Sequence, residues 1–96
     1  MIITITLNPA LDKTLEVPDF SVGQHARAEI KSFIPAGKGI NVARGLNRMR
    51  RACVACALVG RREEGLFADM LKEAPMTEPA LFPVEGITRT NTTILD

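Results

Sequence analysis

Apolar residues form two kinds of extended stretch along the chain. The first kind is continuously apolar or β-branched, as in Ile2 to Leu7 (IITITL) and Ala52 to Val59 (ACVACALV). Such runs are typical of strands that are covered on both faces of a parallel sheet. The second kind alternates polar and apolar residues, over Lys13 to Val17 and over Arg27 to Ile34. Because alternation is typical of strands covered on one face, we expect one covered sheet and one open sheet.

Two other stretches have helical spacing. The segment that follows Pro35 has apolar residues at every third position from Ile40 to Met49, and Gly65 to Glu73 forms a second amphipathic pattern. Residues 80–84 and 88–95 are then expected as strands. A strand, a helix and a strand in succession predict a parallel β-α-β unit.

These elements predict one α/β domain that spans residues 1–96. Its parallel β-α-β core is expected to carry a small β-sheet lid, with lid strands near 13–17 and 27–34 and in part of 80–96. The composition agrees with a globular domain, because 46% of the residues are apolar and the formal net charge is +1.

Membrane insertion and secretion are not expected. The longest apolar run, Ala52 to Gly60, has about half the length of a transmembrane helix. The N-terminus lacks the basic start of a signal peptide. We therefore expect a cytoplasmic protein that binds no membrane.

A cluster of arginines between Arg44 and Arg62 makes nucleic-acid binding one alternative. Eleven acidic residues keep the chain near neutrality, and none of its four phenylalanines is interleaved with the basic cluster to stack on bases. We interpret these arginines as a solvated basic face and expect no nucleic-acid partner.

The two cysteines, Cys53 and Cys56, have the C-x-x-C spacing of redox pairs and zinc sites. In a strand, positions three apart point to opposite faces, and no second Cys/His pair completes a metal site. We interpret them as structural thiols and expect no bound metal. The only histidine, His25, lies in a polar stretch and is expected on the surface.

Candidate binding chemistry is concentrated where Gly37, Lys38 and Gly39 precede Asn41 at the start of the first predicted helix. Glycines let a backbone approach a ligand closely, and the free N–H groups of a helix N-terminus bind anions. The Walker pattern G-x-x-x-x-G-K-[ST] is absent, so an ordinary strand-to-helix turn is the alternative interpretation.

Several short motifs give the chain a resemblance to a known family. They are TLNPALD (6 to 12), AGKGINVAR (36 to 44), Gly60 and TRTN (88 to 91). In order and spacing they resemble the phosphofructokinase B (ribokinase-like) sugar kinases, and within that family the branch of 1-phosphofructokinase and tagatose-6-phosphate kinase. The resemblance extends over all 96 residues and corresponds to the N-terminal part of the family's ribokinase-like fold.

The resemblance implies a substrate site for a sugar phosphate. By family analogy Asp12 supplies a carboxylate to sugar hydroxyls, which agrees with ligand binding at the C-terminal ends of strands in α/β proteins. Gly37, Gly39 and Asn41 are then expected to line the sugar. The glycine pair is expected to act as the hinge of the β lid.

Four further residues receive roles from the same resemblance. Lys38 and Arg89 are expected to bind the phosphate already present on the substrate, because a guanidinium matches paired phosphate oxygens. Asn91, two residues after Arg89, is expected on the same face of its strand. Arg27, in a lid strand, is expected to reach the neighbouring subunit of a homodimer formed through the lids.

The activity that the resemblance implies is transfer of the γ-phosphate of ATP, with Mg²⁺, to a ketohexose phosphate such as fructose 1- or 6-phosphate. The family's glycine-alanine-glycine-aspartate motif, which carries the catalytic base, is not among these residues, so no catalytic or ATP-binding residue is assigned. We expect the chain alone to be inactive. The alternative is a non-catalytic module for sugar-phosphate binding or dimerisation.

The chain also departs from the family where the first predicted helix ends. The family usually has a small residue there, often glycine, whereas this chain has Arg50 followed by Arg51. A residue with a Cβ is disfavoured at a left-handed helix end, so we expect the termination of this helix to be altered.

Overall fold

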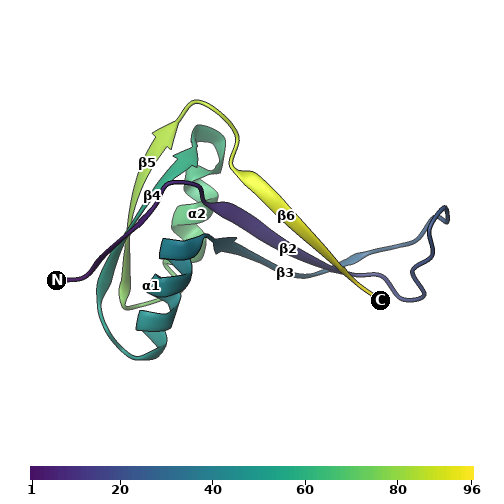
Figure 1. The fold of residues 1–96 in the computed structure, drawn as a ribbon, viewed down its shortest axis with the longest axis horizontal. Coiled ribbons are helices and arrows are strands. Elements are labelled where there is room, and N and C mark those ends of the chain that lie inside the picture. The colour runs from purple at the N-terminus through teal and green to yellow at the C-terminus, as the bar shows by residue number, and fades with distance from the viewer.

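The computed structural model describes residues 1–96 and contains two three-stranded sheets and two α-helices (Figure 1). The elements are β1 (Ile3–Thr6), β2 (Ala10–Glu16), β3 (Glu29–Ala36), α1 (Lys38–Arg48), β4 (Cys53–Gly60), a short 3-10 turn (Arg61–Glu63), α2 (Glu64–Leu71), β5 (Thr77–Val84) and β6 (Arg89–Leu95). The α/β fold with a parallel core and a β lid is thereby confirmed.

The core sheet has the strand order β1-β4-β5, and all of its strands are parallel. Crossovers between parallel strands are right-handed, so two successive steps in the same direction place both helices on the same face. Phe67, Ile40 and Val59 are the largest fully buried side chains, and they fill the layer between this face and the helices. Neither helix is long and apolar enough to cross a membrane.

Helix α1 packs closely because β4 presents alanines to it. Ala55 and Ala57 are almost completely buried, and Ala43 of α1 packs against Ala55. Small side chains on both elements shorten the distance between a helix and a sheet. The same strand places the thiol of Cys53 in this layer and that of Cys56 on the opposite face, where it is half-buried; both are free.

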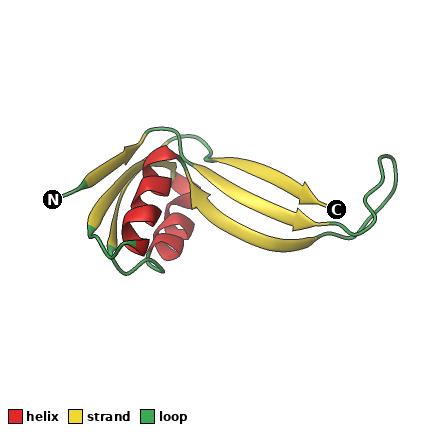
Figure 2. Ribbon diagram, turned by 60° about the horizontal axis from the view of Figure 1, so that its bottom comes forward, coloured by secondary structure: helices red, strands yellow, loops and turns green.

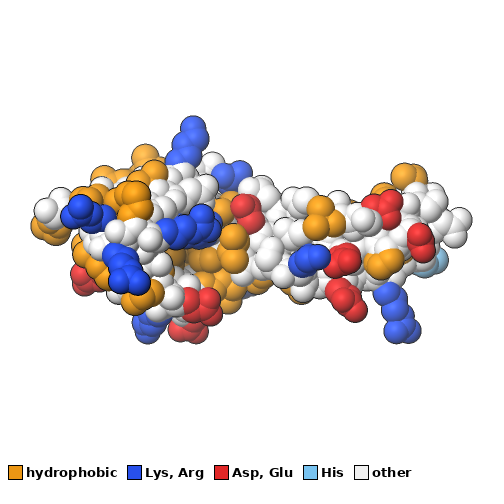
Figure 3. Space-filling model, turned by 90° about the horizontal axis from the view of Figure 1, so that it is seen from below, with side chains coloured by type: hydrophobic (Ala, Val, Ile, Leu, Met, Phe, Trp, Pro, Cys, Tyr) orange, Lys and Arg blue, Asp and Glu red, His pale blue; other side chains and the backbone are white.

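The lid sheet has the order β3-β2-β6, with β2 antiparallel to β3 and parallel to β6. It extends from the core as a narrow arm, so the molecule measures 50 × 33 × 19 Å (Figures 2 and 3). A register shift between Thr14 and Leu15 marks an irregularity in the β2–β3 ladder. Every residue of β6 is exposed, so the backbone ladder rather than burial holds this strand.

Several predicted boundaries differ from the structure. Strand β2 begins at Ala10, so Asp12 lies inside a lid strand instead of after the end of the first strand. The short Asn8-Pro9 link explains this difference, because the chain returns to an extended conformation directly after it. Arg27 lies in the loop before β3, not in the strand. Of the range 80–96, residues 89–95 join the lid, whereas 80–84 belong to the parallel sheet.

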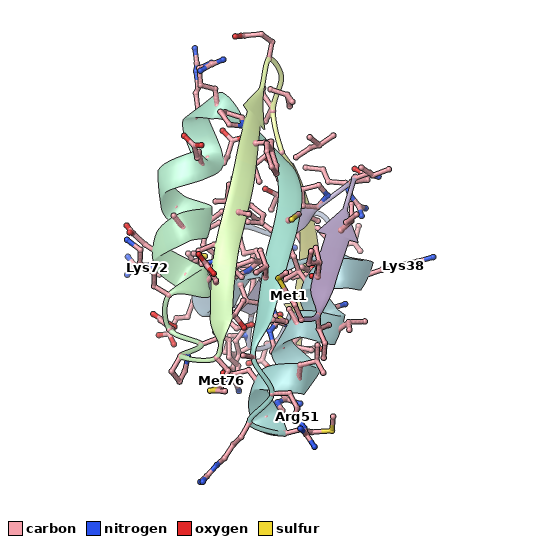
Figure 4. All side chains as sticks on the ribbon, turned by 90° about the vertical axis from the view of Figure 1, so that its left-hand side faces the viewer. Met1, Lys38, Arg51, Lys72 and Met76 are labelled. Carbon is pink, nitrogen blue, oxygen red and sulfur yellow. The ribbon has the colours of Figure 1, made fainter.

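We expected the continuously apolar strands to be covered on both faces of the sheet. This expectation is wrong for β1 and β4. Ile5 of β1 and Leu58 of β4 are exposed, because both helices lie on the other side of the sheet. Figure 4 looks onto the uncovered face, with the three strands in front of the helices.

Helix α1 ends with a left-handed residue in spite of the missing glycine. Arg50 has φ 56°, its N–H donates to the Asn47 carbonyl (3.0 Å), and the Arg51 N–H donates to the Leu46 carbonyl (2.8 Å). This pair of hydrogen bonds is the Schellman motif, which usually has glycine at the left-handed position. The helix end therefore keeps the usual geometry with an unfavourable residue, and the expected alteration is not present.

Replacing Arg50 with glycine should stabilise the chain by about 1 kcal/mol, because the left-handed conformation disfavours a residue with a Cβ by about that amount. The measurement is the midpoint of urea unfolding followed by circular dichroism. Arg51→Gly is the matched control, since Arg51 has no positive φ. Equal or opposite effects of the two substitutions would contradict this account of the helix end.

Candidate functional site

The candidate site lies where the lid joins the parallel sheet. The Asn8-Pro9 link connects β1 to β2, and Gly37 connects β3 to α1, so both connections meet at the carboxyl end of β1. Beside them is a crevice of about 230 Å³, whose lining includes Asn8, Pro9, Gly60 and Arg89. Ligands of open α/β sheets bind at this end of the strands.

The strand register brings Asp12 and Asn91 together. They are paired positions on the parallel strands β2 and β6, and the Asn91 side-chain amide donates to Asp12 Oδ1 (3.1 Å). Asp12 is half-buried and Asn91 is exposed. One carboxylate oxygen and the amide oxygen remain as acceptors, so the pair can bind the hydroxyl groups of a ligand.

Arg89 lies on the same face of β6 as Asn91, as the two-residue spacing predicted. Its guanidinium donates to the carbonyl of Asn8 (3.3 Å), which holds it at the edge of the crevice. The two ion pairs of the structure join Lys31 to Glu16 and Arg61 to Glu85, so the charge of Arg89 is not neutralised by a carboxylate.

The N-terminus of α1 lies directly against β1, and Gly37 and Gly39 make this contact. Gly37 has φ 138°, and a Cβ on it would lie 2.5 Å from Cγ2 of Thr6. A Cβ on Gly39 would lie 2.5 Å from Thr6 Oγ1 and 2.8 Å from the Ile5 carbonyl oxygen. No side chain caps the helix and no acidic residue lies in its first turn, so its free N–H groups can bind an anion.

Lys38 and Asn41 belong to the same helix start, but neither contacts Asp12 or Arg89. Lys38 is exposed, and its side chain extends away from the ribbon (Figure 4). Asn41 Oδ1 accepts a hydrogen bond from Arg44 (3.5 Å). Arg44 also donates to the Pro35 carbonyl, so it fixes the corner between β3 and α1 instead of forming a free basic face.

Arg27 is separated from the other candidate residues. It lies in the loop that joins β2 to β3, at the end of the lid far from the helices (Figure 1). A contribution of Arg27 to the site of its own chain is therefore not supported by its position.

Sequence reasoning did not assign a role to Glu63 or single out Thr88, which fix the start of β6. Glu63 Oε1 accepts from the Thr88 N–H (2.6 Å), and Thr88 Oγ1 accepts from the Gly60 N–H (2.8 Å). A Cβ on Gly60 would lie 2.7 Å from the Gly86 carbonyl oxygen. These contacts join segments about 25 residues apart in the sequence, so no local pattern could have revealed them.

The structure contains no group of three or more His, Cys, Asp and Glu side chains that could hold a metal ion. The candidate site consists of the carboxylate–amide pair of Asp12 and Asn91, the unpaired guanidinium of Arg89 and the N-terminus of α1. This combination can bind a ligand that carries both hydroxyl groups and an anionic group.

Known proteins resemble the chain in sequence and in structure, although no protein-family model matches it. The 1-phosphofructokinase of Bacillus subtilis is 41% identical over 91 residues, which is 95% of this chain and 30% of that protein. The 1-phosphofructokinase of Vibrio cholerae is 33% identical over 95 residues, 99% of this chain and 30% of that protein. The crystal structure of Escherichia coli phosphofructokinase-2 in complex with fructose-6-phosphate superimposes with a TM-score of 0.85 at 27% identity, covering 97% of this chain and 30% of that one.

The chain matches the N-terminal part of phosphofructokinase B family kinases. The predicted resemblance and the ribokinase-like fold are confirmed by these similarities. The chain spans about 30% of the length of the relatives it matches. The site residues that the resemblance implied stay predictions.

Gly39→Ala should destabilise the chain by about 2 kcal/mol, because the new methyl group would overlap Thr6 and the Ile5 carbonyl and force α1 away from β1. Urea unfolding measures the change. Gly45→Ala is the matched control in the same helix: its Cβ would meet no atom within 4 Å, so it should stabilise the chain by about 1 kcal/mol. Effects of the same sign would contradict the close approach of α1 to β1.

Proposed function

We propose that this chain forms the sugar-phosphate-binding part of a kinase. The whole enzyme would transfer the γ-phosphate of ATP to a free hydroxyl of a ketohexose phosphate such as fructose 1-phosphate or fructose 6-phosphate. The hydrogen-bonded pair of Asp12 and Asn91, beside Arg89 and the N-terminus of α1, is the main support for this proposal.

The proposed division of roles follows from charge. Asp12 and Asn91 offer oxygen acceptors and would bind the sugar hydroxyls. Arg89 and Lys38 are cations without an ion-pair partner and would bind the phosphate already on the substrate. Because α1 begins directly after Gly37 and its first turn packs against β1, its free N–H groups add to this attraction for an anion.

Gly37, Gly39 and Asn41 would line the sugar, and the pair Gly37 and Gly39 would also serve as the hinge of the lid. The lid is connected to the core through three short links, at Asn8-Pro9, at Gly37 and at residues 85–88 between β5 and β6. A change of backbone angles at these links would move the lid over the crevice. Closure of such a lid excludes water from the reacting groups.

ATP, Mg²⁺ and the catalytic base are assigned to the part of the kinase that the relatives have beyond the matched region. Phosphoryl transfer depends on groups placed around the γ-phosphate, and none of the residues described above is suited to that position. We therefore expect no turnover from the 96 residues alone.

A homodimer through the lids is proposed for the whole kinase. Leu15 pairs with Ile30 on one side and Ile94 on the other, so the lid face opposite Asp12 carries a row of three apolar side chains. Burial of this row would favour association. Escherichia coli phosphofructokinase-2 has a tetrameric inhibited form, which gives a precedent for assembly among the similar structures. In such a dimer Arg27 would reach the partner's site.

The experiment joins this chain to the part of Bacillus subtilis 1-phosphofructokinase that follows its matched segment. The fusion and the isolated chain are assayed with Mg²⁺-ATP and each of fructose 1-phosphate, fructose 6-phosphate and tagatose 6-phosphate. We expect turnover of at least one sugar phosphate by the fusion and none by the isolated chain. A folded fusion that phosphorylates none of them would contradict the kinase proposal and favour a non-catalytic binding module.

Within the active fusion, Asp12→Asn should lower kcat/KM by roughly 10- to 100-fold, since a hydrogen bond to a charged group contributes about 1.5–3 kcal/mol. Glu16→Gln is the matched control, because Glu16 lies on the same strand but forms an ion pair with Lys31 near the far end of the lid. Equal effects of the two substitutions would remove Asp12 from the substrate site.

A further inference from the structure

A second cavity lies between the two helices and the start of the lid, and we call it the interhelical cavity. It has a volume of about 280 Å³ and is bounded by α1, by the C-terminal end of α2 and by residues 33–35 of β3. None of its lining residues lines the crevice of the candidate site. At roughly 30 Å³ for each small group, the volume of a water molecule in the liquid, it holds a ligand of about ten non-hydrogen atoms.

The floor of the interhelical cavity is apolar. Ile40 and Ala43 of α1 and Leu71 of α2 are buried there, and Phe33 and Met70 are half-buried beside them. These side chains match a ligand whose body is hydrocarbon. A sugar phosphate has hydroxyl groups around its carbon chain, and these would have no partners on such a floor.

The rim of the cavity carries charges of both signs. Arg44 of α1 and Glu73, which follows the end of α2, both line it. The ion pairs of the structure join other residues, so Arg44 and Glu73 pair neither with each other nor with a third charge. An unpaired cation and an unpaired anion at one cavity match a ligand that itself carries both charges.

The guanidinium of Arg44 is fixed by the chain and still has donors for a ligand. It donates to the Pro35 carbonyl and to Asn41 Oδ1 (3.5 Å), which uses two of its five N–H groups. The other three remain for a carboxylate, whose two oxygens match the planar fork of a guanidinium.

Two uncharged polar side chains also line the cavity. Asn47 Oδ1 accepts from the Met76 N–H (3.0 Å), which orients the side chain and leaves its amide N–H donors for a ligand. Thr77 is only 8% exposed, and its hydroxyl oxygen is buried without a hydrogen-bond partner. Thr4 and Thr6 share this property, but of the three only Thr77 lines the cavity. Because an unpaired buried hydroxyl costs free energy, Thr77 favours a polar ligand atom or a water molecule in this cavity.

We propose that the interhelical cavity binds a free α-amino acid with an apolar side chain. The carboxylate of the amino acid pairs with Arg44, its ammonium group pairs with Glu73, and its side chain packs on Ile40 and Leu71. Each chemical part of the ligand thus meets a matching part of the cavity. Since the cavity shares no residue with the candidate site, the inference does not depend on the proposed kinase activity.

An apolar carboxylate without an ammonium group is the competing ligand. It would satisfy Arg44 and the apolar floor, but it would leave the carboxylate of Glu73 unpaired beside a second negative charge. An apolar amine would leave Arg44 unpaired beside a second positive charge. Only a ligand with both charges avoids these two penalties, so the cavity should discriminate against both analogues.

The first test titrates the isotopically labelled 96-residue chain with L-leucine and follows its amide NMR signals. We expect a Kd of about 1 mM or tighter, with the shifts concentrated at Ala43, Leu71 and Thr77. Isocaproate, which is leucine without its ammonium group, and isoamylamine, which lacks the carboxylate, should bind about tenfold more weakly or worse. Glycine, which lacks the apolar side chain, should do the same. Calorimetric titrations of the fusion with the Bacillus subtilis segment make the result independent of whether the isolated chain is folded.

Substitution of Glu73 tests the contact with the ammonium group. Glu73→Gln should weaken the binding of leucine by about fivefold or more and leave that of isocaproate unchanged, because only leucine carries the partner charge. Glu78→Gln is the matched control, since Glu78 is exposed on β5 and does not line the cavity. Arg44→Lys keeps the charge but loses the planar fork, so it should weaken the binding of leucine and of isocaproate alike, by about tenfold.

The outcomes decide between the ligands and separate this inference from the kinase proposal. The absence of any shift or heat at about 10 mM leucine, in both the chain and the fusion, would overturn the site. Isocaproate that binds as tightly as leucine, or equal effects of Glu73→Gln and Glu78→Gln, would overturn the assignment to an amino acid. A fusion that phosphorylates a sugar phosphate but binds no leucine would keep the kinase proposal and reject this one.

Discussion

The contact between the first turn of α1 and strand β1 determines the position of most of the candidate site. Only glycine is accommodated at positions 37 and 39, because a Cβ at either would overlap Thr6. This close approach places the helix N-terminus at the carboxyl end of β1, beside Pro9, where the lid joins the core. The glycines therefore have a packing role that holds whether or not they contact a substrate. The anion-binding potential of the helix follows from the same geometry.

A second set of contacts fixes the strand that carries Arg89 and Asn91. Glu63, Thr88 and Gly60 form a chain of hydrogen bonds from the end of β4 to the start of β6. Since β6 is exposed along its whole length, it has no buried side chain to define its register. The Glu63 contact and the backbone ladder with β2 define it instead. Asn91 therefore lies beside Asp12 because the contacts at the start of β6 fix the backbone register of this strand against β2.

The sequence predicted the type and order of nearly every element, because apolar periodicity is strong in α1 and β4. It also identified the glycine loop and the family resemblance. It could not predict that Asp12 lies within the lid, since the Asn8-Pro9 signal marks a turn without giving its length. Nor could it predict that Ile5 and Leu58 are exposed, because a continuous apolar strand has the same pattern whether one or both faces of its sheet are covered. The role of Glu63 depends on contacts between distant segments and has no local signature.

The core and the lid contribute differently to the stability of the chain. Only 19 of the 96 residues are buried, and they lie mainly between the helices and one face of the parallel sheet. Apart from Ala10, Leu11 and Ala36, which are buried where the lid joins the core, the lid strands add hydrogen bonds but little burial, so they contribute little hydrophobic free energy. The lid face that carries Asp12 and Asn91 is therefore organised by backbone pairing rather than by hydrophobic burial.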